Sequence, residues 1–260
     1  MDIIQYLLQN VQVFILLFVR MLGIFILTPF FGTKNVPTTF KIGLGFFAAV
    51  IVFDTMGPVD LQINNVLDYF IVVISEFIVG LVIGLASMIS FSAIHLAGQL
   101  IDYQLGFGLV NILDIHSETQ VPLMGNFIYI LTILIFMLIN GHYTLFTMLA
   151  KSVDIIPIGK VAFDLSGMSY VLTKMVSDMF ILGFRISAPI ILATLLTDLT
   201  LGIISRTIPQ LNVFMIGIPA KIFVGIFTLL IMLPMYLTII DFMFNGMNAD
   251  IFRLMKFMTR

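Results

Sequence analysis

Long apolar runs alternate with short polar connections along the whole chain. Six runs stand out, at residues 11–31, 42–56, 67–94, 126–148, 171–197 and 213–240. A helix of about 20 apolar residues is long enough to cross a hydrocarbon layer of roughly 30 Å. The second run is short for a span and the last is long. The pattern predicts an all-α integral membrane protein with about six long hydrophobic helices, some of them bent or broken.

The third run continues further than the others. Apolar helical character extends from Leu67 to about Gln104 without a proline. At a rise of ~1.5 Å per residue, such a helix is roughly 55 Å long. We therefore expect this helix to exceed the thickness of a bilayer.

One face of that helix is small and polar. Gly80 and Gly84 have the small-xxx-small spacing that lets helix backbones approach closely, and charges at membrane depth seldom face lipid. Two interpretations stay open: packing against another helix of the same chain, or a subunit interface or the wall of a wet channel. For the second interpretation the candidate residues are Glu76, Gly80, Gly84, Gly98, Gln99 and Asp102.

The connection at residues 105–122 mixes glycines, bulky apolar residues and acidic groups without a clear period. Connections this long and irregular are usually functional or disordered. We expect a loop that fills or gates a cavity, with an ordinary surface loop as the alternative. Gly106 and Gly108 are candidate hinges, Phe107 and Leu109 the stopper, and Asp114 belongs to the same loop.

A second unusual stretch, residues 206–221, interrupts the apolar zone near the end of the chain. It combines helix-breaking and polar residues with apolar ones, so it resembles neither a polar loop nor a membrane helix. The break is placed inside the apolar zone, where backbone groups that it frees need a partner. The candidate bend and assembly residues are Pro209, Gln210, Asn212, Gly217, Pro219 and Lys221.

Composition supports a membrane location and gives no sign of catalysis. The chain of 260 residues is 60% hydrophobic and only 10% charged, too little polar surface for a soluble globule. It has no cysteine, which excludes thiolate chemistry, and its three histidines lack metal-ligand spacing. We expect no enzyme, no cofactor and no metal site. The net charge of −2 gives no indication of nucleic-acid binding.

No linker rich in Ser, Gly or Pro divides the sequence, so we predict a single membrane domain over residues 1–260. Phe occurs 26 times and Met 17 times, while Trp is absent, so the usual Trp belt at the membrane interfaces is missing. We expect much of the surface to face protein rather than lipid.

Several stretches in order resemble the FliR family of flagellar export-apparatus proteins, whose injectisome counterparts are the T subunits of type III secretion. The main stretches are Arg20-Met-Leu-Gly-Ile-Phe, Thr28-Pro-Phe-Phe-Gly32, Ala97-Gly-Gln-Leu-Ile-Asp-Tyr-Gln-Leu-Gly-Phe107, Asn140-Gly-His142 and Pro209-Gln-Leu-Asn-Val-Phe214. The chain departs from the family pattern at Ile115, where a proline usually follows the aspartate, and at Tyr143, where a second histidine is common.

The resemblance implies a non-enzymatic core subunit of the flagellar type III export gate, in the bacterial inner membrane at the flagellar basal body. Its implied partners are FliP-like and FliQ-like membrane subunits, an FlhB-like protein and unfolded flagellar proteins in transit. The family pattern implies a FliP-like part followed by a FliQ-like helical hairpin, which we place at residues 171–240. The stretch at 206–221 is then the bend of this hairpin, with its apolar residues facing protein partners and its polar groups satisfying freed backbone groups. It also implies that the loop after Phe107 is the pore plug.

Three other functions stay open at this point. The chain could serve an injectisome, since the two systems share their architecture. It could act alone as a permease for ions or small molecules, or it could be a plain scaffold for other membrane proteins. A permease should move a defined solute as a purified single species, whereas a gate subunit should be unstable or inert without its partners.

Overall fold

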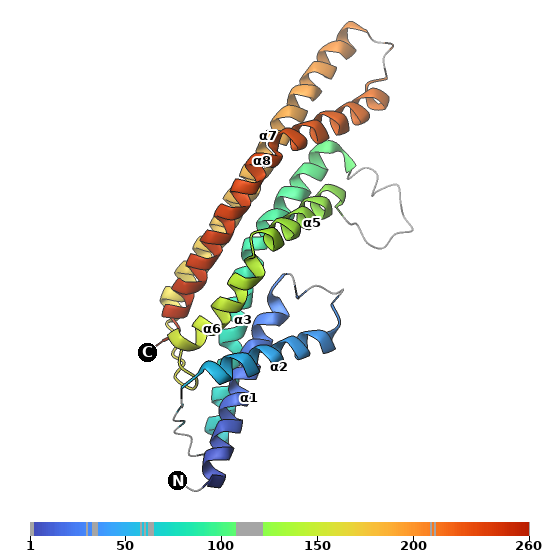
Figure 1. Ribbon diagram of the computed structural model, residues 1–260. Helices are drawn as coiled ribbons and strands as arrows, with labels where there is room; N and C mark the ends of the chain where they lie inside the picture. The colour runs from blue at the N-terminus through green and yellow to red at the C-terminus, as the bar shows by residue number, and fades with distance from the viewer. Residues whose placement is uncertain are drawn as a thin grey trace. The chain divides into compact units, whose positions relative to one another are not determined.

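The structure is a computed structural model that describes residues 3–29, 31–32, 36–57, 59, 61, 65–107, 122–208, 210 and 212–259. The regular elements in this part of the chain are helices, and a single isolated β-bridge joins Val161 to Thr259. The helices in Figure 1 are α1 (Ile3–Leu27), α2 (Thr38–Thr55), α3 (Val66–Leu105), α5 (Leu123–Leu138), α6 (Gly141–Ile155), α7 (Leu165–Thr207) and α8 (Val213–Lys256).

The predicted class, an all-α integral membrane protein, is confirmed. Among the described residues, five helices are long and apolar enough to cross a membrane (α1, α2, α3, α7 and α8), or up to six if α5 and α6 count as one bent span. The run predicted at 126–148 is therefore two helices rather than one. The helix breaks because Asn140 adopts a left-handed backbone conformation, with φ of +56°, which a right-handed helix cannot include.

The long helices exceed a single membrane crossing. α3 has 40 residues, as expected from the sequence, while α7 has 43 and α8 has 44. At ~1.5 Å per residue, each is about 60–65 Å long, against a hydrocarbon core of about 30 Å. Parts of these helices therefore extend beyond any single bilayer crossing.

The bend between α7 and α8 is shorter than predicted. Helix α7 ends at Thr207 and α8 begins at Val213, so α8 continues across Gly217 and Pro219 instead of breaking there. Asn212 starts α8, since its carbonyl oxygen accepts from the N–H of Met215 at 3.1 Å. A proline lacks one backbone N–H donor. Because the first turn of α8 already begins at Asn212, Pro219 lies within the helix and not at its start.

Contacts divide the chain into two compact units, each assembled from distant segments. The first unit is Met1–Ser90, Asn140–Val176 and Asn245–Arg260, and the second is Phe91–Ile139 and Ser177–Phe244. The single membrane domain expected from the sequence stays a prediction. Helices α3, α7 and α8 each contribute residues to both units.

In the first unit, the end of the chain packs against the segment that precedes α7. Ala162 donates its N–H to the carbonyl of Met258 at 3.1 Å, and Asp164 donates to that of Phe257 at 2.8 Å. Met258 is fully buried. These contacts fix the last residues of the described chain to the interior of this unit.

Asp164 caps the first turn of α7. Its Oδ1 accepts from the hydroxyl of Ser166 at 2.5 Å and from the backbone N–H of Ser166 and of Gly167 at 3.1 and 3.3 Å. The Ser166 hydroxyl, followed by the Gly167 N–H, lowers the pKa of this carboxyl below its ordinary value. This cap supplies acceptors for N–H groups that the helix itself leaves unpaired.

In the second unit, α7 and α8 lie side by side and antiparallel (Figure 1). An aromatic cluster forms nearby: the ring of Phe244 lies 5.4 Å from that of Phe91 and 4.8 Å from that of Phe136. The hydroxyls of Thr132 and Tyr236 are 2.8 Å apart and link α5 to α8. The core of this unit therefore draws on α3, α5, α7 and α8.

Candidate pore and assembly site

A fully buried ion pair joins α1 to α3 in the first unit. The Nη2 of Arg20 lies 2.5 Å from Oε2 of Glu76, and Arg20 Nε donates to the same oxygen at 2.6 Å. Both side chains have 0% exposure. Because isolated charges at membrane depth are costly, each of these residues requires the other.

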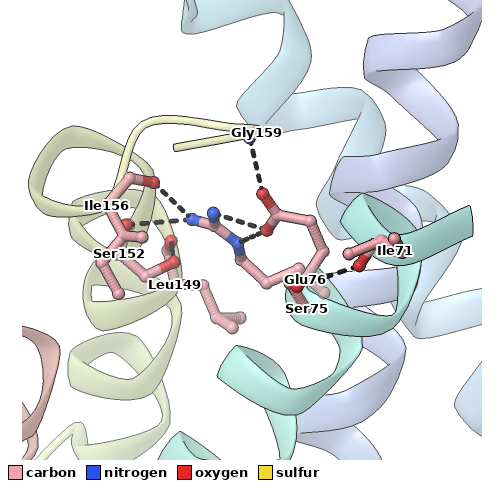
Figure 2. Close-up of polar contacts among 8 residues, drawn as sticks. Ile71, Ser75, Glu76, Leu149, Ser152, Ile156 and Gly159 are labelled. Carbon is pink, nitrogen blue, oxygen red and sulfur yellow. Dashed lines mark hydrogen bonds and ion pairs between the residues drawn. The ribbon is translucent and has the colours of Figure 1, made fainter. Parts of the chain in front are cut away.

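The pair also fixes the segment after α6. Arg20 Nη1 donates to the carbonyls of Ser152 and Ile156 at 3.0 and 2.9 Å, while Oε1 of Glu76 accepts the N–H of Gly159 at 2.8 Å. Figure 2 shows these partners surrounding the guanidinium and the carboxylate. Gly159 has φ of +79°, a conformation that favours glycine. One ion pair therefore connects α1, α3 and the end of α6.

A seam of glycines brings α1 and α3 together beside this pair. A Cβ atom at Gly80 would overlap the carbonyl oxygen of Arg20, and one at Gly84 would lie 2.9 Å from that of Ile24. On α1, a Cβ at Gly23 would lie 2.7 Å from the carbonyl oxygen of Phe77. The small-xxx-small spacing thus has a direct structural role, since only glycine permits this backbone approach.

The same helix makes a second close contact in the second unit. Gly98 of α3 lies against the backbone of Gly125 in α5, where a Cβ atom would overlap the Gly125 Cα. Asp102, 6% exposed, accepts the backbone N–H of Met124 at 2.9 Å and of Gly125 at 3.0 Å. The carboxylate therefore binds the first turn of α5.

Of the six residues predicted at a subunit interface or pore wall, the structure places five in contacts within the chain: Glu76, Gly80, Gly84, Gly98 and Asp102. These contacts correspond to the intramolecular packing that the sequence left open. Gln99 is exposed. A role of this helix at a subunit interface or in a pore wall stays a prediction.

The predicted gate loop is described only at its start. Gly106 directly follows α3, has φ of +86° and donates its N–H to the carbonyl of Tyr103 at 3.3 Å, and Phe107 is half-buried. Gly108, Leu109 and Asp114 lie outside the described residues. The gating role of this loop stays a prediction.

The predicted bend residues lie close to the turn between α7 and α8. Gln210 and Asn212 are exposed, Pro219 is exposed within α8, Gly217 is buried, and Pro209 lies outside the described residues. Lys221 pairs with Asp198 of α7, with Nζ 2.6 Å from Oδ1. This ion pair links the two helices of the hairpin within the apolar zone.

Sequence reasoning missed the partners of these residues. Only the structure shows that Arg20 pairs with Glu76 and that Asp198 pairs with Lys221. A signal existed, because a basic and an acidic residue in separate apolar runs must each find a counter-charge. Within the described part of the chain, no group of three or more His, Asp or Glu residues is placed to hold a metal ion.

Comparison with known proteins covers nearly the whole chain. Flagellar biosynthetic protein FliR of Bacillus subtilis is 36% identical over 236 residues, which is 89% of this chain and 90% of that protein. FliR of Escherichia coli is 26% identical over 235 residues, 89% of each chain. Surface presentation of antigens protein SpaR of Shigella flexneri is 25% identical over 228 residues, 86% of this chain and 87% of that protein.

The family model matches the part of the chain that contains the contacts described above. The family model described as bacterial export proteins, family 1, matches residues 11–247, which include the buried ion pair, the glycine seam, Asp102 and most of the α7–α8 hairpin. The chain, a helical membrane protein, belongs to the bacterial export proteins, family 1.

Proposed function

We propose that this chain is a non-enzymatic core subunit of the flagellar type III protein export gate, forming part of the pore through which unfolded flagellar proteins are secreted. The observation that carries the proposal is the similarity to FliR of Bacillus subtilis, which has 36% sequence identity over 89% of this chain. The family match to export proteins over residues 11–247 supports the same function.

The exposed surface of the α7–α8 hairpin supports membership of a larger assembly. In the candidate span Met215–Lys256, only 6% of the most apolar window is buried within the chain. Large apolar side chains such as Phe223 (73%) and Ile231 (65%) are exposed. Because α8 is about twice as long as the hydrocarbon core of a bilayer is thick, partner proteins are needed to cover part of this surface.

Charged residues on α7 favour protein partners over lipid. Lys174 and Arg185 are exposed within this apolar helix, and among the described residues neither forms an ion pair. A lysine or arginine facing hydrocarbon is costly. A neighbouring subunit with acidic or carbonyl groups at these positions would remove that cost.

The finer assignments belong to the same proposal. The partners are FliP-like and FliQ-like subunits and an FlhB-like protein, in the bacterial inner membrane at the flagellar basal body. The hairpin at 171–240 is the FliQ-like part, and Gly106, Phe107, Gly108, Leu109 and Asp114 belong to the plug. Gln99 on α3 and Gln210 at the bend, both exposed, are available to neighbouring subunits.

Use in an injectisome is the second candidate, supported by the similarity to SpaR of Shigella flexneri. The sequence identity to SpaR is 25%, whereas the identity to FliR of Bacillus subtilis is 36%. The difference favours the flagellar system. A permease acting alone stays the alternative of a different class.

Copurification tests the proposal. The chain is tagged at its N-terminal end, because Met258 is buried and the carbonyls of Met258 and Phe257 accept hydrogen bonds from Ala162 and Asp164. Native membranes are extracted in mild detergent, and proteins present in stoichiometric amounts are identified by mass spectrometry. FliP-like and FliQ-like partners are the expected result. A clean monomer or homodimer that moves a defined solute would overturn the proposal in favour of the permease.

A further inference from the structure

A hollow of about 450 Å³ lies between α1 and α2 in the first unit. The two helices pack against each other there (Figure 1). The lining residues are Phe14 of α1 and Val50, Ile51, Phe53, Asp54 and Thr55 of α2. Most of the α2 side chains among them are exposed, so the hollow opens to the surroundings. It combines apolar walls with a single carboxylate.

The carboxylate of Asp54 has no counter-charge within the described part of the chain. Asp54 is exposed, and none of the ion pairs between described residues includes it. On α1, Arg20 is already bound to Glu76, and Lys41 lies in the first turn of α2, at the opposite end of that helix. Between Lys41 and Lys151 the sequence has no lysine or arginine. A cation at this carboxylate therefore has to come from another molecule.

Two further features of the hollow favour a cation. Asp54 is the second-last residue of α2, and the C-terminal end of a helix carries partial negative charge. The rings of Phe14 and Phe53 meet edge to face, with centroids 5.8 Å apart and planes at 87°. Such a pair leaves ring faces free, and the face of an aromatic ring attracts ammonium and guanidinium groups. The carboxylate, the helix end and the rings therefore favour the same kind of ligand.

The apolar part of the wall favours a side chain over a bare ion. Val50 is 42% exposed and Ile51 is 66% exposed, and both line the hollow. Lysine and arginine lay their methylene stems along apolar surface while the charged head remains at a polar site. A free monovalent cation would gain nothing from these walls.

A phospholipid headgroup fits the hollow less well than a basic side chain does. A headgroup with an ammonium also brings a phosphate, and a phosphate is bound by lysine, arginine or a helix N-terminus. The hollow offers a carboxylate and a helix C-terminus instead, and both repel a phosphate. A lysine or arginine side chain carries no such negative group.

We propose that the hollow between α1 and α2 is a docking site for a lysine or arginine side chain of a partner protein, with Asp54 as the counter-charge and Phe14 and Phe53 as aromatic walls. That the partner is a subunit of the same export assembly rests on the proposed function, whereas the site rests on the residues that line the hollow. Because complementary charges across an interface fix its register, the contact sets how the partner sits on α1 and α2.

Photocrosslinking in the purified assembly tests the site. Ile51, which lines the hollow and is exposed, is replaced by p-benzoylphenylalanine. After irradiation, the peptide joined to position 51 is identified by mass spectrometry. We expect a peptide of a copurified subunit that contains lysine or arginine.

A matched pair of variants tests the role of the carboxylate. Asp54→Asn removes the charge and keeps the side-chain volume. Asp154→Asn is the control, because Asp154 is also exposed and is the second-last residue of α6, yet it does not line the hollow. Asp54→Asn should weaken the contact by about 10- to 100-fold, the equivalent of losing a hydrogen bond to a charged group, so that most crosslinked product is lost. Asp154→Asn should leave the yield unchanged.

Exchanging the charges is the sharpest test. Asp54→Lys should abolish the crosslink, and changing the basic residue found in the partner to glutamate should restore it. If the Asp54→Asn chain does not accumulate, the wild-type chain is crosslinked at rising ionic strength instead. The yield should then fall with salt, because salt screens an exposed charge pair.

A crosslink to phospholipid alone would overturn the proposal in favour of a lipid site. A peptide without lysine or arginine, no crosslink at all, a yield that salt does not change, or equal losses with Asp54→Asn and Asp154→Asn would also overturn it. Copurified subunits without a crosslink at position 51 refute the site and leave the proposed function intact. If those subunits are absent, the proposed function fails, and the site stands only if position 51 still joins a basic peptide in a manner that depends on Asp54.

Discussion

Replacing Arg20 by methionine tests whether the buried ion pair organises the first unit. The change removes the cation that binds Glu76 and the donors to Ser152 and Ile156. The Glu76 carboxylate then stays buried with one described donor, the N–H of Gly159. Removing one partner of a buried pair costs about 3–5 kcal/mol. We expect Glu76→Gln to cost slightly less, because its amide oxygen still accepts from Gly159.

The double variant Arg20→Met with Glu76→Leu should cost less than the sum of the single changes. Neither charge is then left alone, although the N–H of Gly159 and the carbonyl of Ile156 each lose a partner. Such an unpaired buried group costs about 1–3 kcal/mol. The coupling energy between the two positions should therefore reach about 4 kcal/mol.

Exchanging the charges should not restore stability. In Arg20→Glu with Glu76→Arg, a carboxylate would face the carbonyls of Ser152 and Ile156, and a guanidinium would face the N–H of Gly159. The backbone groups around the pair therefore give it a fixed direction. A pair held by Coulomb attraction alone would tolerate the exchange.

The assay is thermal unfolding in detergent, followed by far-UV circular dichroism. Because unfolding of such proteins is often irreversible, apparent Tm values are compared at one scan rate. Arg253→Met is the matched control: it breaks an ion pair with Asp250 in which the arginine side chain is 55% exposed. Such exposed pairs contribute about 0–1 kcal/mol. The reasoning fails if Arg20→Met lowers the apparent Tm no more than this control, or if the exchanged pair matches the wild type.

Three further predictions follow from single contacts. Gly80→Ala should lower the apparent Tm, because its Cβ would overlap the Arg20 carbonyl oxygen, whereas Gly202→Ala should keep or raise it, because nothing lies within 4 Å of a Cβ there; equal effects would contradict the glycine seam. The pKa of Asp164 is lowered by its cap hydrogen bonds, so the stability it contributes is present above its unfolded pKa and lost as pH falls through the lower folded value. Asp164→Asn should remove this part of the acid dependence of the melting curve, and a curve of unchanged shape below about pH 4 would refute it. Asn212→Leu should leave the protein in the membrane but impair assembly or secretion, since Asn212 is exposed and starts α8; normal copurification together with normal secretion would contradict its assignment to assembly.

The break at Asn140 and the continuity of α8 show where apolar pattern stops being informative. The run at 126–148 reads as one helix, yet Asn140 adopts a left-handed conformation and separates α5 from α6. Conversely, Pro219 suggests a break, yet α8 passes through it. A single backbone dihedral or cap decides these cases, and hydropathy reports neither.

In the candidate site, too, the sequence indicated the important residues but not their partners. The small and polar face of α3 was visible at Glu76, Gly80 and Asp102, because charges and glycines within an apolar helix need a specific reason. Their partners were not visible. Arg20 lies 56 residues from Glu76 in sequence, and the amides that Asp102 binds are backbone groups without any side-chain signature.

By itself, therefore, the sequence determined that this protein is helical and embedded in a membrane, since run length and charge content depend only on composition along the chain. It also determined which residues of α3 could not face lipid. Only the tertiary structure decided that Glu76 binds Arg20, that Gly98 meets Gly125 and that Asp102 caps α5. These contacts depend on which helices approach one another, and that is set by packing between segments far apart in the sequence rather than by any local pattern.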